Sequence, residues 1–358
     1  MAAGVGTGEC TVATRVTDRI AFVGAGAIGG SVAADLIDAG GELVVVDQWP
    51  EHVEAMRARG LQVTMPDRTV EVPVDAHHLC DLASLKPTFD IVFTAVNAYD
   101  ARWVAQLVEP YLALDGILVG IQNSMTIHDH AAIVGPERTV GCVVELSAEL
   151  FDPGVIQRNT DRIGTWIAVG ELDGSVTPRV ERLATMLANA ATTAVTANIY
   201  GAKWTKLVTN SMMMGPYCLF GLKEKEASRL PGMMDISIAL GREAAAVGAA
   251  LGYELEPLFG LTPEDFAGGG DDVLVKALNT LLDDVGERAL NTMIQDHLKG
   301  RRSEYEFING LVAERGHELG IATPASDAVV DLSRQIDRGQ LEMSPDNLDR
   351  LQALLAEA

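Results

Sequence analysis

Residues 19–47, RIAFVGAGAIGGSVAADLIDAGGELVVVD, contain the pattern that decides the fold. A short apolar run leads into a glycine-rich turn, a helical pattern follows, and a second apolar run ends at an acid. Strand, helix and strand in this order form a β-α-β unit, whose two strands lie parallel in one sheet. The segment therefore predicts the start of a parallel α/β sheet.

Further apolar runs continue this sheet, and their Val and Ile content indicates strands covered on both faces. We predict strands at 90–96, 116–122, 139–150, 165–172 and 191–198, a hairpin of 61–65 with 69–74, and a helix at 177–190. From residue 199 the pattern becomes helical, with helices predicted at 199–222, 233–252, 271–289, 304–320 and 323–339.

The turn carries the spacing GxGxxG in Gly24, Gly26 and Gly29, directly after a predicted strand and before a predicted helix. Such glycines let backbone N–H groups approach a pyrophosphate, although they also serve simply to pack a helix closely on a strand. Asp47 ends the next predicted strand, where a carboxylate can accept hydrogen bonds from ribose hydroxyls. Together these features favour a dinucleotide site made of Gly24, Ala25, Gly26, Ala27, Ile28, Gly29 and Asp47.

Asp47 also bears on which dinucleotide binds. Its charge would repel a 2′-phosphate, and the next residues, Gln48, Trp49 and Pro50, offer no cation to hold one. Arg57 and Arg59 are better explained as the solvated end of the following helix. We therefore expect NAD(H), with NADP(H) as the alternative.

These patterns predict an α/β dinucleotide-binding domain of the Rossmann type followed by an all-helical domain. We expect a loose tail at 1–18, the Rossmann domain at 19–197 and a helical substrate and dimerisation domain at 198–358.

Composition excludes several kinds of partner. A formal net charge of −23 opposes a broad nucleic-acid or anionic-membrane surface, so a small anionic ligand needs local cations. Four cysteines without framework spacing, and no apolar run of ~20 residues, favour a cytoplasmic protein without a membrane span. His128, Asp129 and His130 lack a distant third ligand, so we expect a loop at the start of a helix there and no metal site.

Two segments of the helical half carry candidate catalytic residues. Lys206 and Asn210 are four residues apart and share a helix face with Lys203, which suits a general acid and a positioning amide. The alternative is an amphipathic helix with surface lysines. Glu304 opens a predicted apolar helix face, either as a site carboxylate or as a first-turn acid favoured by the helix dipole.

From Arg19 onward the chain resembles the ketopantoate reductase family. The resemblance rests on VGAGAIGG at 23–30, QNS at 122–124, KWTKLVTN at 203–210 and RSEYEFINGL at 302–311. It implies hydride transfer between NAD(P)H and a 2-oxo acid or 2-hydroxy acid, in a protein that is often a homodimer.

The resemblance also implies roles for particular residues. Lys206 would protonate the carbonyl oxygen, and Glu304 would orient the substrate hydroxyl. Asn123 and Asn210 would position cofactor and substrate, while Thr292 would hold the substrate carboxylate.

Two departures leave the substrate open. Asn97, on the cofactor side of the cleft, stands where the family usually has Lys, and Met214 stands where it commonly has a second substrate-holding Asn. Losing a polar partner weakens discrimination for the group it bound, and Met tolerates bulkier apolar groups. An NAD-dependent D-2-hydroxyacid dehydrogenase is therefore the main alternative, and a non-enzymatic NAD(H) sensor the second.

Overall fold

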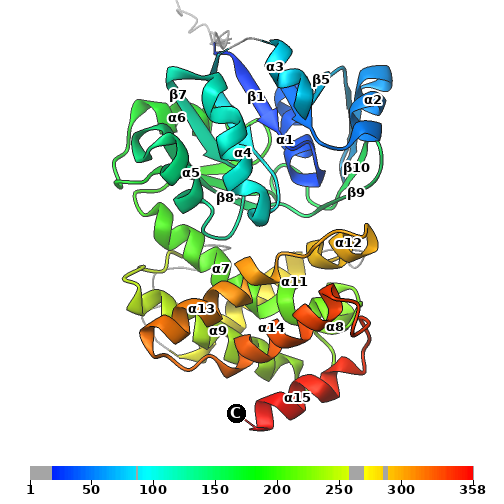
Figure 1. Cartoon of the computed structure of the whole chain (residues 1–358), viewed down its shortest axis with the longest axis vertical. Coiled ribbons are helices and arrows are strands. Elements are labelled where there is room, and N and C mark those ends of the chain that lie inside the picture. Colours follow the sequence, from blue (N-terminus) through cyan, green and yellow to red (C-terminus); the bar gives the residue numbers. More distant parts are fainter. Residues whose placement is uncertain (1–17, 86–87, 258–269, 285–288, 358) are drawn as a thin grey trace, which may run out of the picture.

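The structure is a computed structural model that describes residues 18–85, 88–257, 270–284 and 289–357. The tail expected at 1–18 lies outside these residues apart from Asp18. A layered α/β half lies beside a half built from helices (Figure 1).

The first half is organised around an eight-stranded sheet. Its strands, in spatial order, are β12 (Thr192–Val195), β11 (Trp166–Glu171), β8 (Thr139–Glu145), β7 (Leu112–Gly120), β6 (Phe89–Thr94), β1 (Ile20–Val23), β2 (Leu43–Asp47) and β5 (Asp75–His78). All neighbours run parallel except β8 and β11, which are antiparallel. An antiparallel neighbour needs no helical crossover, and the chain between these two strands forms further strands instead.

Those strands belong to a second, four-stranded sheet in the order β4 (Thr69–Val72), β3 (Leu61–Thr64), β10 (Val155–Arg158) and β9 (Ala148–Asp152). The hairpin predicted from 61–65 and 69–74 is confirmed, since β3 and β4 pair antiparallel with Leu61 opposite Val72. The strand predicted at 139–150 is wrong as a single element, because the chain leaves the large sheet after Glu145 and enters the small one at Ala148. A continuous apolar pattern does not reveal such a change of sheet.

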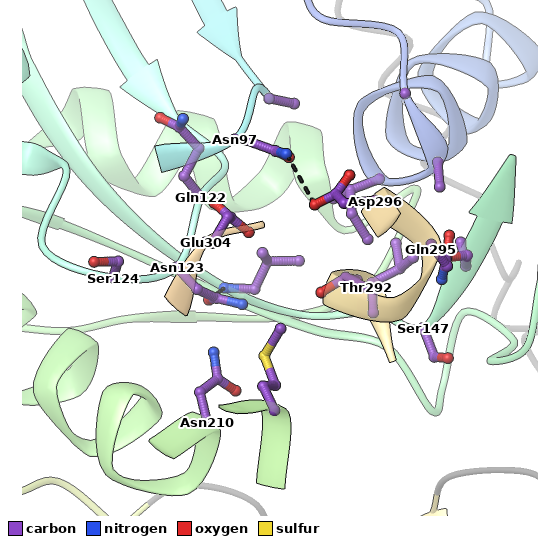
Figure 2. A pocket seen from close by; sticks show the side chains of 18 of the residues that line it. Asn97, Gln122, Asn123, Ser124, Ser147, Asn210, Thr292, Gln295, Asp296 and Glu304 are labelled. Carbon is purple, nitrogen blue, oxygen red and sulfur yellow. Dashed lines mark hydrogen bonds between the residues drawn. The ribbon is translucent and has the colours of Figure 1, made fainter. Parts of the chain in front are cut away.

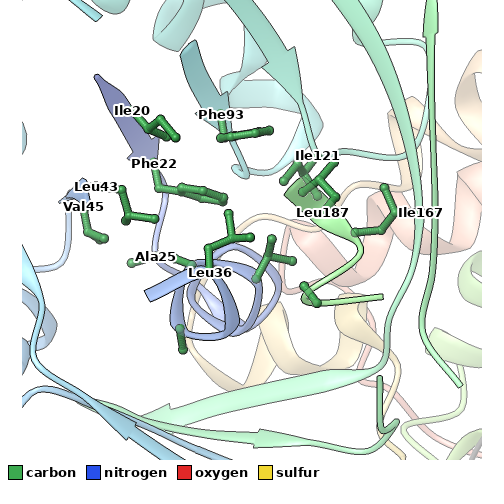
Figure 3. Packing of buried hydrophobic residues seen from close by; sticks show 14 of the residues in the cluster. Ile20, Phe22, Ala25, Leu36, Leu43, Val45, Phe93, Ile121, Ile167 and Leu187 are labelled. Carbon is green, nitrogen blue, oxygen red and sulfur yellow. The ribbon is translucent and has the colours of Figure 1, made fainter. Parts of the chain in front are cut away.

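Helix α1 (Ala27–Asp38) packs against strands of both sheets and closes the core. Phe22 of β1 stacks on Phe93 of β6, with ring centroids 4.7 Å apart, and both face α1 (Figure 3). This packing holds the glycine turn between β1 and α1 against the ends of the strands. Helices α2 (Pro50–Arg59), α4 (Ala101–Val108), α5 (Ile127–Val134) and α6 (Pro178–Leu187) complete this half, with a one-turn helix α3 (Leu82–Leu85).

The second half contains only helices and turns among the residues that the structure describes after Val195. They are α7 (Ile199–Cys218), α8 (Glu224–Ala227), α9 (Met233–Ala250), α11 (Asp271–Asp284), α12 (Thr292–Leu298), α13 (Asn309–Leu319), α14 (Pro324–Asp337) and α15 (Asn347–Glu357). Helix α7 is buried along almost its whole length, because it contacts both the large sheet and the surrounding helices. None of the described helices has the length and apolar character that a membrane span needs.

The helix predicted at 304–320 begins five residues late. Tyr305–Phe307 form a 3-10 turn, Ile308 has φ −115° and ψ −96°, and the α-helix starts at Asn309. The Asn309 amide donates to the Ser211 carbonyl oxygen at 3.0 Å, which fixes this start against α7. Glu304 is therefore in irregular backbone. The helix predicted at 271–289 is described only to Asp284.

Candidate functional site

A cavity of about 260 Å³ lies between the carboxyl ends of the sheet strands and the helices α7 and α12. Open parallel sheets bind ligands at this edge. The cavity brings together most of the residues that the sequence singled out: Gly26, Ala27, Ile28, Asn97, Asn123, Lys206, Asn210, Thr292 and Glu304. A second cavity beside it is lined by Gly24, Gly26 and Asp47, among others.

The glycines of the turn have different tasks. At Gly24, where φ is +96°, a Cβ atom would lie 2.6 Å from the Ala95 carbonyl oxygen, and at Gly29 it would lie 2.1 Å from that of Gly24. These two glycines are required by packing. A Cβ at Gly26 would meet nothing within 4 Å, and Gly26 borders both cavities, so its backbone is open to a ligand. The turn therefore fits a dinucleotide phosphate at Gly26.

Asp47 joins the end of β2 to this turn. Its carboxylate accepts a hydrogen bond from the Ala25 N–H at 2.6 Å and another from the Trp49 N–H at 2.8 Å. Each carboxylate oxygen keeps a further acceptor position for a ribose hydroxyl. Ala25 itself is fully buried and borders neither cavity. Its role is thus to hold the Asp47 carboxylate.

Lys206 projects from α7 into the first cavity and forms an ion pair with Glu145 at the end of β8. Only 5% of Lys206 is exposed, so the interpretation as a surface lysine is wrong. Lys203 is also buried, but it donates to the carbonyl oxygens of Gln122 and Cys142 and ties α7 to the sheet. Burial lowers the pKa of Lys203 to about 8.

Two acids beside Lys206 were not found from the sequence. Glu145 was hidden inside a predicted continuous strand, although a charge within such a run was a usable signal. Glu224 of α8 borders the same cavity. Burial, and secondly the charge of Glu145, raise the pKa of Glu224 to about 7, while Lys206 acts in the opposite direction. Lys206 is therefore accompanied by Glu145, with which it pairs, and by Glu224, which is partly protonated near neutral pH.

Glu304 lines the same cavity and reaches from the helical half to the sheet half. Its Oε1 accepts a hydrogen bond from the Ala98 N–H at 2.5 Å. Burial raises its pKa to about 7, and that hydrogen bond acts in the opposite direction. Asn97 donates to Asp296 of α12 at 3.1 Å, as the dashed line in Figure 2 marks. Burial raises the pKa of Asp296 to about 6.

Three further polar residues that the sequence singled out, Asn123, Asn210 and Thr292, line the same cavity. Asn123 accepts a long hydrogen bond of 3.4 Å from the Val144 N–H, and Asn210 approaches it from α7 (Figure 2). The Thr292 hydroxyl is buried and has no hydrogen-bond partner in the described residues. Because an unpaired buried hydroxyl costs free energy, it is suited to a ligand acceptor in the cavity. Met214 lines the wall beside it.

His128, Asp129 and His130 lie within α5, so the loop expected for them is wrong. The described residues contain no group of three or more His, Cys, Asp or Glu side chains that could hold a metal ion. The His130 ring is fully buried, whereas the His128 ring stacks on Tyr200 at 5.4 Å between centroids.

The fold and cavity define a class: a Rossmann-type half joined to a helical half, with the open Gly26 turn, Lys206 and Glu304 lining one cavity. Two family profiles match the chain, "Ketopantoate reductase PanE/ApbA" over residues 20–174 and "Ketopantoate reductase PanE/ApbA C terminal" over residues 198–337. The chain belongs to the ketopantoate reductase family of oxidoreductases.

Individual relatives agree with this membership. The 2-dehydropantoate 2-reductase of Archaeoglobus fulgidus is 28% identical over 322 residues, which cover 90% of this chain and 98% of the relative. That of Mesorhizobium japonicum is 28% identical over 345 residues, covering 90% and 99%.

Solved structures show the same fold. A PanE/ApbA family ketopantoate reductase from Ralstonia eutropha superposes with a TM-score of 0.75 at 24% identity, covering 90% of this chain and 99% of the other. A D-mandelate dehydrogenase in a ternary structure with NADH and anilino(oxo)acetate superposes with a TM-score of 0.77 at 20% identity, also covering 90% and 99%.

Proposed function

We propose that the protein transfers hydride between NAD(P)H, with NADH preferred, and a small 2-oxo acid. The observation that carries this proposal is that Lys206, paired with Glu145, shares one cavity with the open Gly26 turn and with Glu304. The bound nicotinamide would supply the hydride. Residues of this chain would donate the proton and position the substrate.

The Lys206 ammonium is the proton donor for the carbonyl oxygen, which gains negative charge as hydride arrives at the carbon. Glu145 holds the ammonium in place through the ion pair. After the transfer Lys206 is a neutral amine, and the proton on Glu224 is available in the same cavity to restore the ammonium. The residues thus form a short route that returns a proton to the donor.

Glu304, Thr292 and Asn210 position the substrate. In its ionised form, which is partly populated near neutral pH, Glu304 accepts a hydrogen bond from a substrate hydroxyl, and its position is held by the Ala98 N–H. The unpaired Thr292 hydroxyl and the Asn210 amide are donors for the substrate carboxylate. Met213 and Met214 form an apolar wall that suits a larger side chain on the substrate.

The preference for NADH rests on Asp47 at the second cavity. Its carboxylate can accept from both ribose hydroxyls and repels a 2′-phosphate. The same feature, together with the apolar Met wall, favours a second candidate function, oxidation of D-2-hydroxy acids with NAD⁺. The structural likeness to a D-mandelate dehydrogenase is a likeness of fold.

A substrate panel tests the proposal. We would measure NADH and NADPH oxidation with ketopantoate and with 2-oxo acids that carry branched or aromatic side chains, and the reverse reaction with D-2-hydroxy acids and NAD⁺. Turnover of a 2-oxo acid, faster with NADH, supports the proposal; efficient turnover only of hydroxy acids supports the second candidate. Nucleotide binding without turnover of any compound would indicate a sensor.

Lys206→Ala is the matching variant. Loss of a general acid costs about 10²- to 10⁴-fold in rate. We expect that loss in kcat, with a much smaller change in the Kd for NADH, because Lys206 acts on the substrate carbonyl and does not border the second cavity, where Asp47 would hold the adenosine half. Near-normal turnover in this variant would refute the assignment of the proton donor.

A further inference from the structure

Arg301 brings a positive charge from the helical half to the dinucleotide-binding half. It follows α12 and the turn at Gly300, and its backbone N–H donates to the Asp296 carbonyl oxygen at 2.8 Å. Figure 1 shows α12 at the side of the helical half that faces β9 and β10. The Arg301 guanidinium carbon lies 5.9 Å from the centroid of the Trp49 ring, two residues beyond Asp47. The side chain therefore crosses to the site where the adenosine half of a dinucleotide is expected.

Arg301 also lies where the two cavities meet. Six residues border both: Gly26, Ala95, Val96, Asn97, Leu150 and Arg301. Asp47 and Trp49 border only the second cavity, and Lys206 and Glu304 only the first. A dinucleotide with its adenosine beside Asp47 and its nicotinamide beside Lys206 must pass its pyrophosphate through this junction, next to the open Gly26 backbone.

The charges at the junction favour the same assignment. Acids dominate the chain, so two phosphates require nearby cations. Lys206 is paired with Glu145, and Lys299 borders only the first cavity, with its ammonium over the Phe151 ring. The Arg301 guanidinium forms no ion pair with any carboxylate of the described residues, whereas that of Arg302 pairs with Glu306. A planar guanidinium with free donors matches phosphate oxygens well.

We propose that Arg301 binds the pyrophosphate of the dinucleotide, opposite the Gly26 turn, so that cofactor binding joins the helical half to the sheet half. This inference rests on the proposed nicotinamide-dependent function. It also supplies a cation that the residues after Asp47 do not contain. Because a pyrophosphate is common to both nucleotides, Arg301 contributes equally to NADH and NADPH.

Binding measurements test this without turnover. We would determine the Kd of NADH, NADPH, ADP-ribose and adenosine for the wild type, Arg301→Ala and Arg302→Ala by calorimetry. Hydrogen bonds to charged groups predict about a ten- to hundredfold weaker Kd in Arg301→Ala for all three ligands that contain a pyrophosphate. Adenosine should bind as before. Arg302→Ala is the matched control, since it removes an adjacent exposed arginine, and should leave every Kd unchanged.

Three results would overturn the inference. An unchanged Kd for NADH and ADP-ribose in Arg301→Ala would remove Arg301 from the site. A loss of affinity confined to NADPH would indicate that Arg301 contacts the 2′-phosphate. An equal loss of affinity for adenosine would indicate that Arg301 acts through the Trp49 ring. If the wild type binds no dinucleotide, the proposed function itself fails. If the wild type binds NADH and Arg301→Ala binds it equally well, only the inference about Arg301 fails. Equal thermal unfolding of both variants and the wild type excludes a folding defect as the cause.

Discussion

The ion pair between Lys206 and Glu145 leads to the sharpest prediction, because the sequence did not point to it. Glu145→Gln keeps the size of the side chain and one acceptor oxygen but removes the charge that holds the ammonium. The Lys206 and Glu145 side chains are 7% and 28% exposed. Exposed pairs contribute ~0–1 kcal/mol and truncated buried pairs cost about 3–5 kcal/mol, so this pair falls between these limits, at about 1–3 kcal/mol.

Expressed as a rate, this cost lowers kcat/KM about five- to 150-fold, since ~1.4 kcal/mol corresponds to a factor of ten. The assay is steady-state reduction of the best 2-oxo acid at saturating NADH, with the Kd for NADH measured alongside. We expect most of the loss in kcat and only a small change in the Kd for NADH, because Glu145 contacts the Lys206 ammonium and does not border the second cavity, where Asp47 would hold the adenosine half.

A control separates this effect from a general loss of an ion pair. Glu171 ends β11 and pairs with Arg179, away from both cavities. Glu171→Gln should lower the thermal stability while leaving kcat unchanged. If Glu145→Gln retains the wild-type kcat/KM, or if Glu171→Gln lowers kcat equally, the pair does not position the proton donor and our reasoning is refuted.

Three further predictions follow from individual groups. Thr292→Val removes an unpaired hydroxyl. Losing its hydrogen bond to the substrate, at ~1–2 kcal/mol, should raise KM for the 2-oxo acid about five- to thirtyfold and leave the thermal stability unchanged or slightly higher. An unchanged KM would contradict a role in carboxylate binding. Asp47→Asn should shift the ratio of NADPH to NADH affinity toward NADPH by about tenfold, and an unaltered ratio would show that this acid does not select the nucleotide. The pKa of Glu224 is raised from 4.5 to about 7, so the native state binds more protons than the unfolded state and stability falls as pH rises across that window. Between pH 4.5 and about 7, the Tm of Glu224→Gln should therefore fall less than the Tm of the wild type. Identical profiles of Tm against pH would contradict the raised pKa of Glu224.

Much of the fold was predictable because its signals are local. The glycine turn at 24–29, the strand that ends at Asp47 and the hairpin around 61–74 each depend on neighbouring residues, and the structure contains all three elements. The break of the predicted 139–150 strand did not show, because the apolar pattern continues while the chain changes sheets. The late start of α13 was missed for a related reason, since Asn309 is fixed by its bond to Ser211 on another helix.

The sequence by itself determined a dinucleotide-type turn, the acid that follows it, a helical second half and the residues by which the chain resembles its family. Only the tertiary structure decided what surrounds them: Glu145 and Glu224 beside Lys206, the bond from Ala98 to Glu304, and Arg301 over Trp49. The physical reason is the separation in sequence of the residues that interact. Turn and helix patterns follow from steric and hydrogen-bond rules within a few residues, whereas ion pairs, desolvation and shared cavities arise between residues that only packing brings together.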